Sequence, residues 1–275
     1  MFEFYEKVST TFNKIRDIEM QDNNPFLLEI VNNGVKYEFF VRINRKSKIL
    51  LVFGSGAYKP SEMTLPVFQR HSWISDFEES MIYYNDPTLY LDRLTLGWGF
   101  GVPESHYLKV ISDILKNIIN LLGYKYDNTY FYGSSAGGFM SMILASMLKG
   151  STAIVNNPQT IFTNYHPGPV KKLLNALDIS EETAITDYEE RVNVVSSFRK
   201  YGYIPRIYYL QNAFAKNDME NHLIPFLNEI KKLVGLDIYN NLKIELYFNH
   251  KLGHNPIGKT QTINFIKNII YNKYK

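Results

Sequence analysis

The sequence predicts an α/β domain with a mostly parallel central sheet flanked by helices. Short apolar runs that suit buried strands alternate with longer segments whose apolar residues recur at helical spacing. Turns rich in glycine and asparagine separate these segments, and no stretch resembles a linker. We therefore expect one domain over residues 1–275.

The expected elements follow from these patterns. Runs at 26–31 and 35–42 are joined by Asn32-Asn33-Gly34, which predicts an N-terminal antiparallel hairpin. Further strands are expected at 48–53, 128–132, 151–155, 206–210 and 242–248. Helices are expected at 104–122, 138–148, 171–177, 187–198, 219–234 and 258–271. Residues 160–200 are predicted to form a small cap or an irregular excursion over the sheet.

The composition argues against nucleic-acid binding, cysteine chemistry and a membrane-spanning segment. A formal charge of +3 with scattered lysines does not indicate a nucleic-acid groove. The chain has no cysteine, which excludes disulfides, thiolate nucleophiles and Cys-ligated zinc; no metal is expected. The N-terminus does not resemble a secretory signal, and no apolar run reaches the roughly 18 residues of a transmembrane segment. We expect a cytoplasmic protein; its oligomeric state is not predicted.

A Gly-x-Ser-x-Gly pattern lies directly after an aromatic run and directly before an apolar helical run. This context is typical of a nucleophile elbow, a sharp strand-to-helix turn that leaves little room for a side chain two residues to either side of the serine. Gly133 and Gly137 fill those positions around Ser135, whereas a turn centred on Ser134 would place the Tyr132 ring there. The pattern therefore predicts Ser135 as a nucleophile; the alternative is a structural glycine turn with a buried hydroxyl.

Two segments are candidates for an oxyanion hole. The backbone N–H of Ala136 would lie at the N-terminus of the apolar helix, where the helix dipole favours negative charge. The loop after the strand at 48–53 reads Gly-Ser-Gly-Ala, and its Ser55 and Gly56 are both candidates for the second donor. The alternative for that loop is a plain turn.

A serine hydroxyl needs a base to remove its proton, and in a sheet of this type the expected chain order is serine, acid, histidine. His254 lies in a glycine-flanked turn before the last predicted helix and is favoured as the base over His250, which follows its strand too closely. For the acid, Asp218 follows the strand at 206–210 and is favoured over Glu220 and Asp237. Asp218 would otherwise act as a helix N-cap.

The loops at the carboxyl ends of parallel strands should meet in one crevice, because ligands in such sheets bind there. The segments that we expect to converge are 54–58, Ser135, 156–159, 211–218 and 249–254. An aromatic and glycine cluster at 97–101 adds Trp98, whose flat apolar face suits a sugar ring; the alternative is a core position.

With these residues the chain resembles the α/β-hydrolase superfamily, in particular a bacterial branch encoded with surface-glycan genes. That branch includes capsule polysaccharide O-acetyltransferases and the accessory secretion protein that O-acetylates exported serine-rich glycoproteins. The matching pieces are Asp86-Pro-Thr-Leu-Tyr90, Gly97-Trp98, Tyr132-Gly-Ser-Ser135-Ala-Gly-Gly138, Asn157-Pro158-Gln159-Thr160, Gln211-Asn212, Asp218, His222 and Gly253-His254.

The resemblance implies an α/β-hydrolase fold, a Ser135, Asp218, His254 triad and acyl transfer through an acyl-serine, from acetyl-CoA to a bacterial surface glycan. It also implies that Trp98, Gln159, Gln211, Asn212 and His222 lie on the substrate side, with His222 either there or behind the triad. Two other functions stay open: a carboxylesterase or glycan deacetylase with the same triad, and a non-catalytic glycan-binding or export partner.

Overall fold

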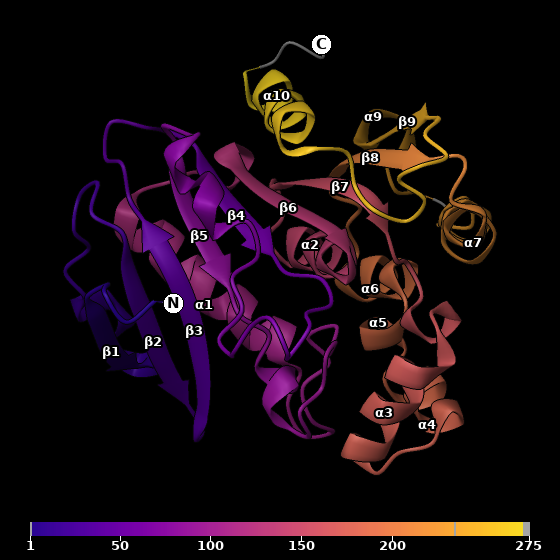
Figure 1. Cartoon of the computed structure of the whole chain (residues 1–275), viewed down its shortest axis with the longest axis horizontal. Coiled ribbons are helices and arrows are strands. Elements are labelled where there is room, and N and C mark those ends of the chain that lie inside the picture. Colours follow the sequence, from indigo (N-terminus) through magenta and orange to yellow (C-terminus); the bar gives the residue numbers. More distant parts are fainter. Residues whose placement is uncertain (1, 234, 272–275) are drawn as a thin grey trace.

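The computed structural model describes residues 2–233 and 235–271, and its centre is a nine-stranded sheet (Figure 1). The strand order is β1-β2-β3-β5-β4-β6-β7-β8-β9. The strands are β1 (Lys7–Thr11), β2 (Phe26–Asn32), β3 (Val35–Arg42), β4 (Leu50–Gly54), β5 (Ser80–Tyr84), β6 (Thr129–Ser135), β7 (Thr152–Pro158), β8 (Arg206–Asn212) and β9 (Leu242–Tyr247).

The sheet is mostly parallel, and β3 is the strand that runs antiparallel to both of its neighbours. β2 pairs antiparallel with β3, and β3 with β5. The pairs β1–β2, β5–β4, β4–β6, β6–β7, β7–β8 and β8–β9 are parallel. The predicted hairpin is confirmed: Asn33 and Gly34 adopt left-handed backbone at its turn, as a tight hairpin requires. The predicted α/β class with a mostly parallel sheet is confirmed as well.

Helices cover both faces of the sheet. They are α1 (Tyr107–Leu122), α2 (Ala136–Met147), α3 (Pro167–Leu177), α4 (Glu181–Asp187), α5 (Glu189–Val192), α6 (Val194–Tyr201), α7 (Lys216–Asp218), α8 (Ile224–Ile230), α9 (Ile238–Asn241) and α10 (Lys259–Ile270). Successive residues of β4 point to opposite faces. Leu50 and Val52 belong to the core with α1 and α2, whereas Leu51 and Phe53 belong to the core with α10.

The helix α2 begins where β6 ends and lies entirely inside the domain. Each of its 12 residues is buried, which explains why the sequence there is apolar or small all round rather than amphipathic. Ser135 is the last residue of β6 and the N-cap of α2. The elbow is therefore anchored in the core.

Three parts of the structure differ from the sequence predictions. β1 and β5 were not predicted, and the region 160–200 folds into α3 to α6, of which α6 packs in the same core as α2. The helix predicted at 219–234 is preceded by α7, passes through a π-helical turn over Met219–Leu223 and continues as α8 to Ile230. The predicted end at Val234 lies outside the described residues. Among the helices of the described residues, none combines the length and apolarity that a membrane span needs.

Candidate active site

Ser135 lies in a strained strand-to-helix turn at the carboxyl end of β6. Its backbone has φ 54° and ψ −128°, a conformation that side chains rarely adopt and that is found mainly at functional sites. A Cβ at Gly133 would lie 2.2 Å from the carbonyl carbon of Gly137, and one at Gly137 would lie 2.6 Å from the carbonyl oxygen of Gly54. The glycines flanking Ser135 are thus required by backbone packing.

The structure brings Ser135, His254 and Asp218 together. His254 Nε2 lies 3.0 Å from Ser135 Oγ, and His254 Nδ1 lies 2.8 Å from both carboxylate oxygens of Asp218. Because an ionised carboxylate only accepts hydrogen bonds, Nδ1 carries the proton and Nε2 is left as an acceptor for the Ser135 hydroxyl. This arrangement can activate the serine as a nucleophile.

Exposure differs sharply along this chain of hydrogen bonds. The Asp218 side chain is 3% exposed, whereas the His254 side chain is 38% exposed. Asp218 directly precedes the π-helical turn over Met219–Leu223, but its backbone is already helical and its side chain makes no capping hydrogen bond there. Its carboxylate binds His254 instead, so Asp218 does not act as a capping side chain. A buried acid behind a solvent-accessible imidazole leaves the serine and its base open to a substrate.

Two asparagines at strand ends hold the loop that carries His254. Asn157 Nδ2 donates to the carbonyl of His254 at 3.0 Å, and Asn157 Oδ1 accepts from the backbone N–H of Asn212 at 2.7 Å. Asn212 Nδ2 donates to the carbonyls of Asn249 and Gly253 at 2.8 and 2.9 Å. Asn212 is fully buried, so it does not face substrate as expected and instead fixes the histidine loop.

Gln159 contacts the nucleophile itself. Its Nε2 donates to Ser135 Oγ at 3.2 Å, and its Oε1 accepts from the indole N–H of Trp98. The Trp98 bond decides which end of the buried amide faces Ser135. Trp98 is fully buried and stacked on Phe162, so the expectation of a sugar-stacking platform is wrong: neither face of the indole is open to a ligand.

Gln211 and His222, also expected on the substrate side, are fully buried. Gln211 Nε2 donates to the carbonyl of Asn212. Thr160 holds His222 from both sides: its N–H donates to His222 Nδ1 and its hydroxyl donates to the His222 carbonyl. Burial lowers the pKa of His222 to about 4. Of the two expected places for His222, the geometry matches the one behind the triad.

Two of the expected oxyanion donors, Ala136 and Gly56, lie beside Ser135, and the Gly56 N–H is already engaged. Ala136 begins α2, which places its N–H beside the nucleophile. The Gly56 N–H donates to Gln69 Oε1 at 2.9 Å, and the Ser55 hydroxyl bridges the Val67 carbonyl and the Gln69 N–H. A substrate oxygen can reach the Gly56 N–H only if the Gln69 side chain moves.

The neighbouring serine has a different environment. Arg70 Nη2 donates to Ser134 Oγ at 2.7 Å, and the guanidinium lies over the rings of Trp73 and Tyr132 at 5.5 and 5.4 Å. The Ser134 hydroxyl is therefore held by the Arg70 guanidinium, whereas His254 binds the hydroxyl of Ser135. This contact agrees with the register that predicts Ser135.

Comparisons with known proteins agree with this geometry at the level of fold. No family model matches the chain, and no curated protein matches it in sequence. Among solved structures, a mutant of the capsule O-acetyltransferase of Neisseria meningitidis serogroup A in complex with CoA is similar, with a TM-score of 0.66 at 17% identity, covering 93% of this chain and 99% of that chain. An S-formylglutathione hydrolase from Agrobacterium tumefaciens has a TM-score of 0.56 at 12% identity, covering 93% of this chain and 95% of that chain.

The chain has the α/β-hydrolase fold. A Glycosylation Associate Protein complex from Streptococcus agalactiae also matches, with a TM-score of 0.60 at 13% identity, covering 90% of this chain and 47% of that chain. The fold expected from the resemblance is thereby confirmed.

Some residues around Ser135 were not predicted. Gln69 and Arg70 belong to the long connection between β4 and β5, and their contacts with Gly56 and Ser134 join segments far apart in sequence. No local pattern marks either residue. Within residues 2–233 and 235–271, no group of three or more His, Cys, Asp and Glu side chains is placed to hold a metal ion.

Proposed function

We propose that this protein is a serine acyltransferase that moves an acetyl group from acetyl-CoA to a hydroxyl of a bacterial surface polysaccharide or glycan, in the cytoplasm. The observation that carries the proposal is the hydrogen-bonded series from Ser135 through His254 to Asp218. The likeness to a capsule O-acetyltransferase, in a structure that contains CoA, favours acetyl transfer over other acyl chemistry.

In the first half-reaction, Ser135 Oγ attacks the thioester carbonyl carbon while His254 Nε2 takes the hydroxyl proton. Asp218 accepts the hydrogen bond of Nδ1–H and stabilises the imidazolium that forms. The carbonyl oxygen gains negative charge, which the Ala136 N–H at the start of α2 is placed to stabilise. When the C–S bond breaks, the thiolate receives the proton from Nε2, which leaves an acetyl-serine.

In the second half-reaction, a glycan hydroxyl gives its proton to His254 Nε2 and its oxygen attacks the acetyl carbonyl carbon. The bond to Ser135 Oγ then breaks, and Oγ recovers the proton. Gln159 Nε2, which donates to the same oxygen, is placed to stabilise it as it leaves. Water in place of the sugar hydroxyl would give an esterase or deacetylase.

The experiment is to incubate the protein with labelled acetyl-CoA, with and without candidate bacterial glycans, alongside Ser135→Ala. Label transferred to glycan by the wild type and lost in Ser135→Ala supports the proposal. Serine-dependent release of acetate that no glycan changes would instead indicate a hydrolase. Absence of any serine-dependent turnover would favour a binding or export partner.

A further inference from the structure

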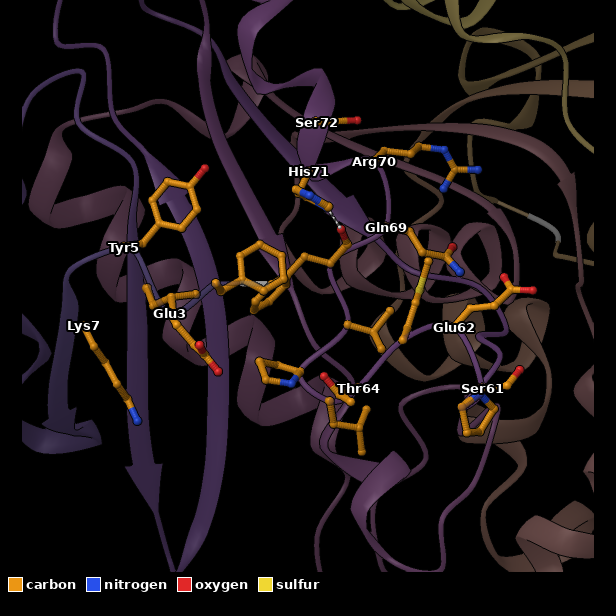
Figure 2. Close-up of a pocket in the computed structure, with 18 residues that line it drawn as sticks. Glu3, Tyr5, Lys7, Ser61, Glu62, Thr64, Gln69, Arg70, His71 and Ser72 are labelled. Carbon is orange, nitrogen blue, oxygen red and sulfur yellow. Dashed lines mark hydrogen bonds between the residues drawn. The ribbon is translucent and has the colours of Figure 1, made fainter.

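A cavity of about 1030 Å³ lies between the N-terminal segment at residues 2–7 and the loop at 60–72 that follows β4 (Figure 2). Figure 2 shows Glu3, Tyr5 and Lys7 on one side of this cavity and Gln69 and Arg70 on the other. Binding sites for small molecules and cofactors usually measure about 300–1,000 Å³. The cavity is far larger than an acetyl group requires and suits a ligand of cofactor size.

One end of the cavity is lined by residues that contact the neighbours of the nucleophile. Gln69 lines the cavity, and its side-chain oxygen accepts a hydrogen bond from the Gly56 N–H. Gly56 is close to the nucleophile, because a Cβ built on it would lie 3.8 Å from Ser135 Cβ. Arg70 also lines the cavity and binds the hydroxyl of Ser134. The Gln69 side chain therefore links the cavity lining to the loop beside Ser135, and its movement away would free the Gly56 N–H.

The lining is amphipathic. Leu27, Leu65 and Val67 supply apolar surface, while Ser61 and Thr64 supply hydroxyl groups. A ligand chain that alternates methylene groups with amides can pack its methylene groups against this apolar surface, and its amides can form hydrogen bonds with the hydroxyl groups.

Charge in the lining is balanced, which argues against a polyanion inside the cavity. Lys7 and Arg70 carry positive charges, and Glu3 and Glu62 carry negative ones. Lys7 is paired with Glu29 at 2.8 Å, and Glu62 with Lys59 at 3.1 Å. The guanidinium of Arg70 is held at Ser134. An uncharged ligand segment fits this balance better than a phosphate does.

We propose that this cavity holds the uncharged arm of the acyl donor, a chain of methylene and amide groups that ends in the thioester, with the donor's phosphates outside. The proposal rests on the proposed function. When the arm binds, Gln69 swings away from the Gly56 N–H, and the thioester carbonyl takes its place beside Ser135. The cavity thereby selects a long thioester over a short ester.

The test fills the cavity from its solvent-exposed rim. Thr64→Trp and Ser61→Trp each place an indole in the cavity at exposed positions, which limits their effect on folding. Thr186→Trp is the matched control, because Thr186 is exposed on α4 and lies outside the cavity lining. Each variant is assayed with acetyl-CoA, with p-nitrophenyl acetate and with p-nitrophenyl octanoate, and CoA binding is measured by calorimetry.

We expect both cavity variants to lower kcat/KM for acetyl-CoA, through KM, at least about tenfold more than kcat/KM for p-nitrophenyl acetate, and to weaken CoA binding in parallel. Thr186→Trp should match the wild type. Equal effects on the long thioester and the short ester would overturn the proposal, as would a selective loss with p-nitrophenyl octanoate, which would assign the cavity to a long acyl chain.

If the proposed acyltransferase function is wrong, the assays give a result that differs from the one that overturns the cavity assignment. A wild-type protein that turns over none of the three substrates would refute the acyltransferase. The cavity assignment would then be judged from calorimetry alone: CoA binding that Thr64→Trp weakens supports it, and CoA binding that is absent or unchanged overturns it.

Discussion

Replacing Trp98 with phenylalanine tests whether the indole N–H orients the amide that contacts the nucleophile. Trp98 Nε1 donates to Gln159 Oε1, and Gln159 Nε2 donates to Ser135 Oγ. Phenylalanine retains an aromatic ring against Phe162 but removes the donor. Gln159 is fully buried, so its carbonyl oxygen would lose its partner in this network, and either end of the amide could then face Ser135.

Two magnitudes follow. Leaving the buried Gln159 oxygen without a donor lowers the free energy of unfolding by about 1–3 kcal/mol. The phenylalanine ring is smaller than the indole and leaves a void at this buried position, which lowers it further by about 1–2 kcal/mol. The free energy of unfolding should therefore fall by about 3 kcal/mol, within the roughly 5–15 kcal/mol of a typical domain. Loss of one neutral hydrogen bond to Ser135 Oγ, worth about 1 kcal/mol, lowers kcat about fivefold.

The assay is a double-mutant cycle with Gln159→Met, measured by urea unfolding and by hydrolysis of p-nitrophenyl acetate. Methionine has no acceptor to leave unsatisfied, so Trp98→Phe should cost at least 1 kcal/mol less in the Gln159→Met background than in the wild type. Phe162→Leu, which alters the packing of Trp98 without touching the hydrogen bond, should lower stability but leave kcat within about twofold. The reasoning would be refuted if the losses in unfolding free energy of Trp98→Phe and Gln159→Met simply added in the double variant. A Trp98→Phe variant with wild-type kcat would refute it as well.

Three further perturbations test the triad, the elbow and the buried histidine. Asp218→Asn should keep the circular dichroism spectrum but lower kcat by about 10⁴-fold, because an amide N–H would donate to His254 Nδ1 and force the proton onto Nε2; a loss below about tenfold would contradict the assigned acid. Gly133→Ala should prevent accumulation of folded protein, since its Cβ would meet backbone at 2.2 Å, whereas Gly168→Ala, whose Cβ meets nothing within 4 Å, should stay within about 0.5 kcal/mol of the wild type in urea unfolding. Equal stability of the two glycine variants would contradict the packing argument. Folding lowers the pKa of His222 from 6.5 to about 4, so on acidification the unfolded chain takes up a proton at this residue before the folded protein does. The free energy of unfolding should therefore decrease by roughly 3 kcal/mol as the pH is lowered from about 6.5 to about 4. The free energy of unfolding of His222→Gln, measured by urea titration at each pH, should therefore fall less over this range than that of the wild type. Wild type and variant losing the same free energy between these pH values would contradict the assignment to His222.

The features that the sequence predicted are those set by local backbone geometry or by topology. Tight packing at Gly133 and Gly137 is a local requirement of the elbow, so the pattern itself selected Ser135. The carboxyl ends of parallel strands share one edge, so chain order alone was enough to expect His254 and Asp218 close to the serine.

The features that the sequence did not predict depend on contacts between distant segments. Trp98 and Gln159 are 61 residues apart, and Arg70 and Ser134 are 64 apart, so neither pair leaves a periodic pattern. A tryptophan between glycines does not reveal whether another ring covers it, so the sequence leaves Trp98 open as a sugar platform or a core position. The ring of Phe162 covers it, and the core alternative holds.

The two missed strands differ in how much signal their sequences carry. β1 is a short edge strand whose residues alternate between exposed and half-buried positions, so it has no apolar run. β5 is five fully buried residues inserted between β3 and β4. Its run of apolar and aromatic residues is the pattern typical of a buried strand, so β5 could have been predicted in the same way as the strand at 48–53.

The central claim is that Ser135, and not Ser134, carries the acyl group, and mass spectrometry of the acid-quenched protein tests it most directly. The protein is mixed with acetyl-CoA in the absence of glycan, quenched, digested and sequenced by fragmentation. We expect one acetyl group on Ser135 in the wild type and in Ser134→Ala, and none on the elbow peptide of Ser135→Ala. An acetyl group that persists on that peptide in Ser135→Ala, or that disappears in Ser134→Ala while the fold is intact, would contradict the account.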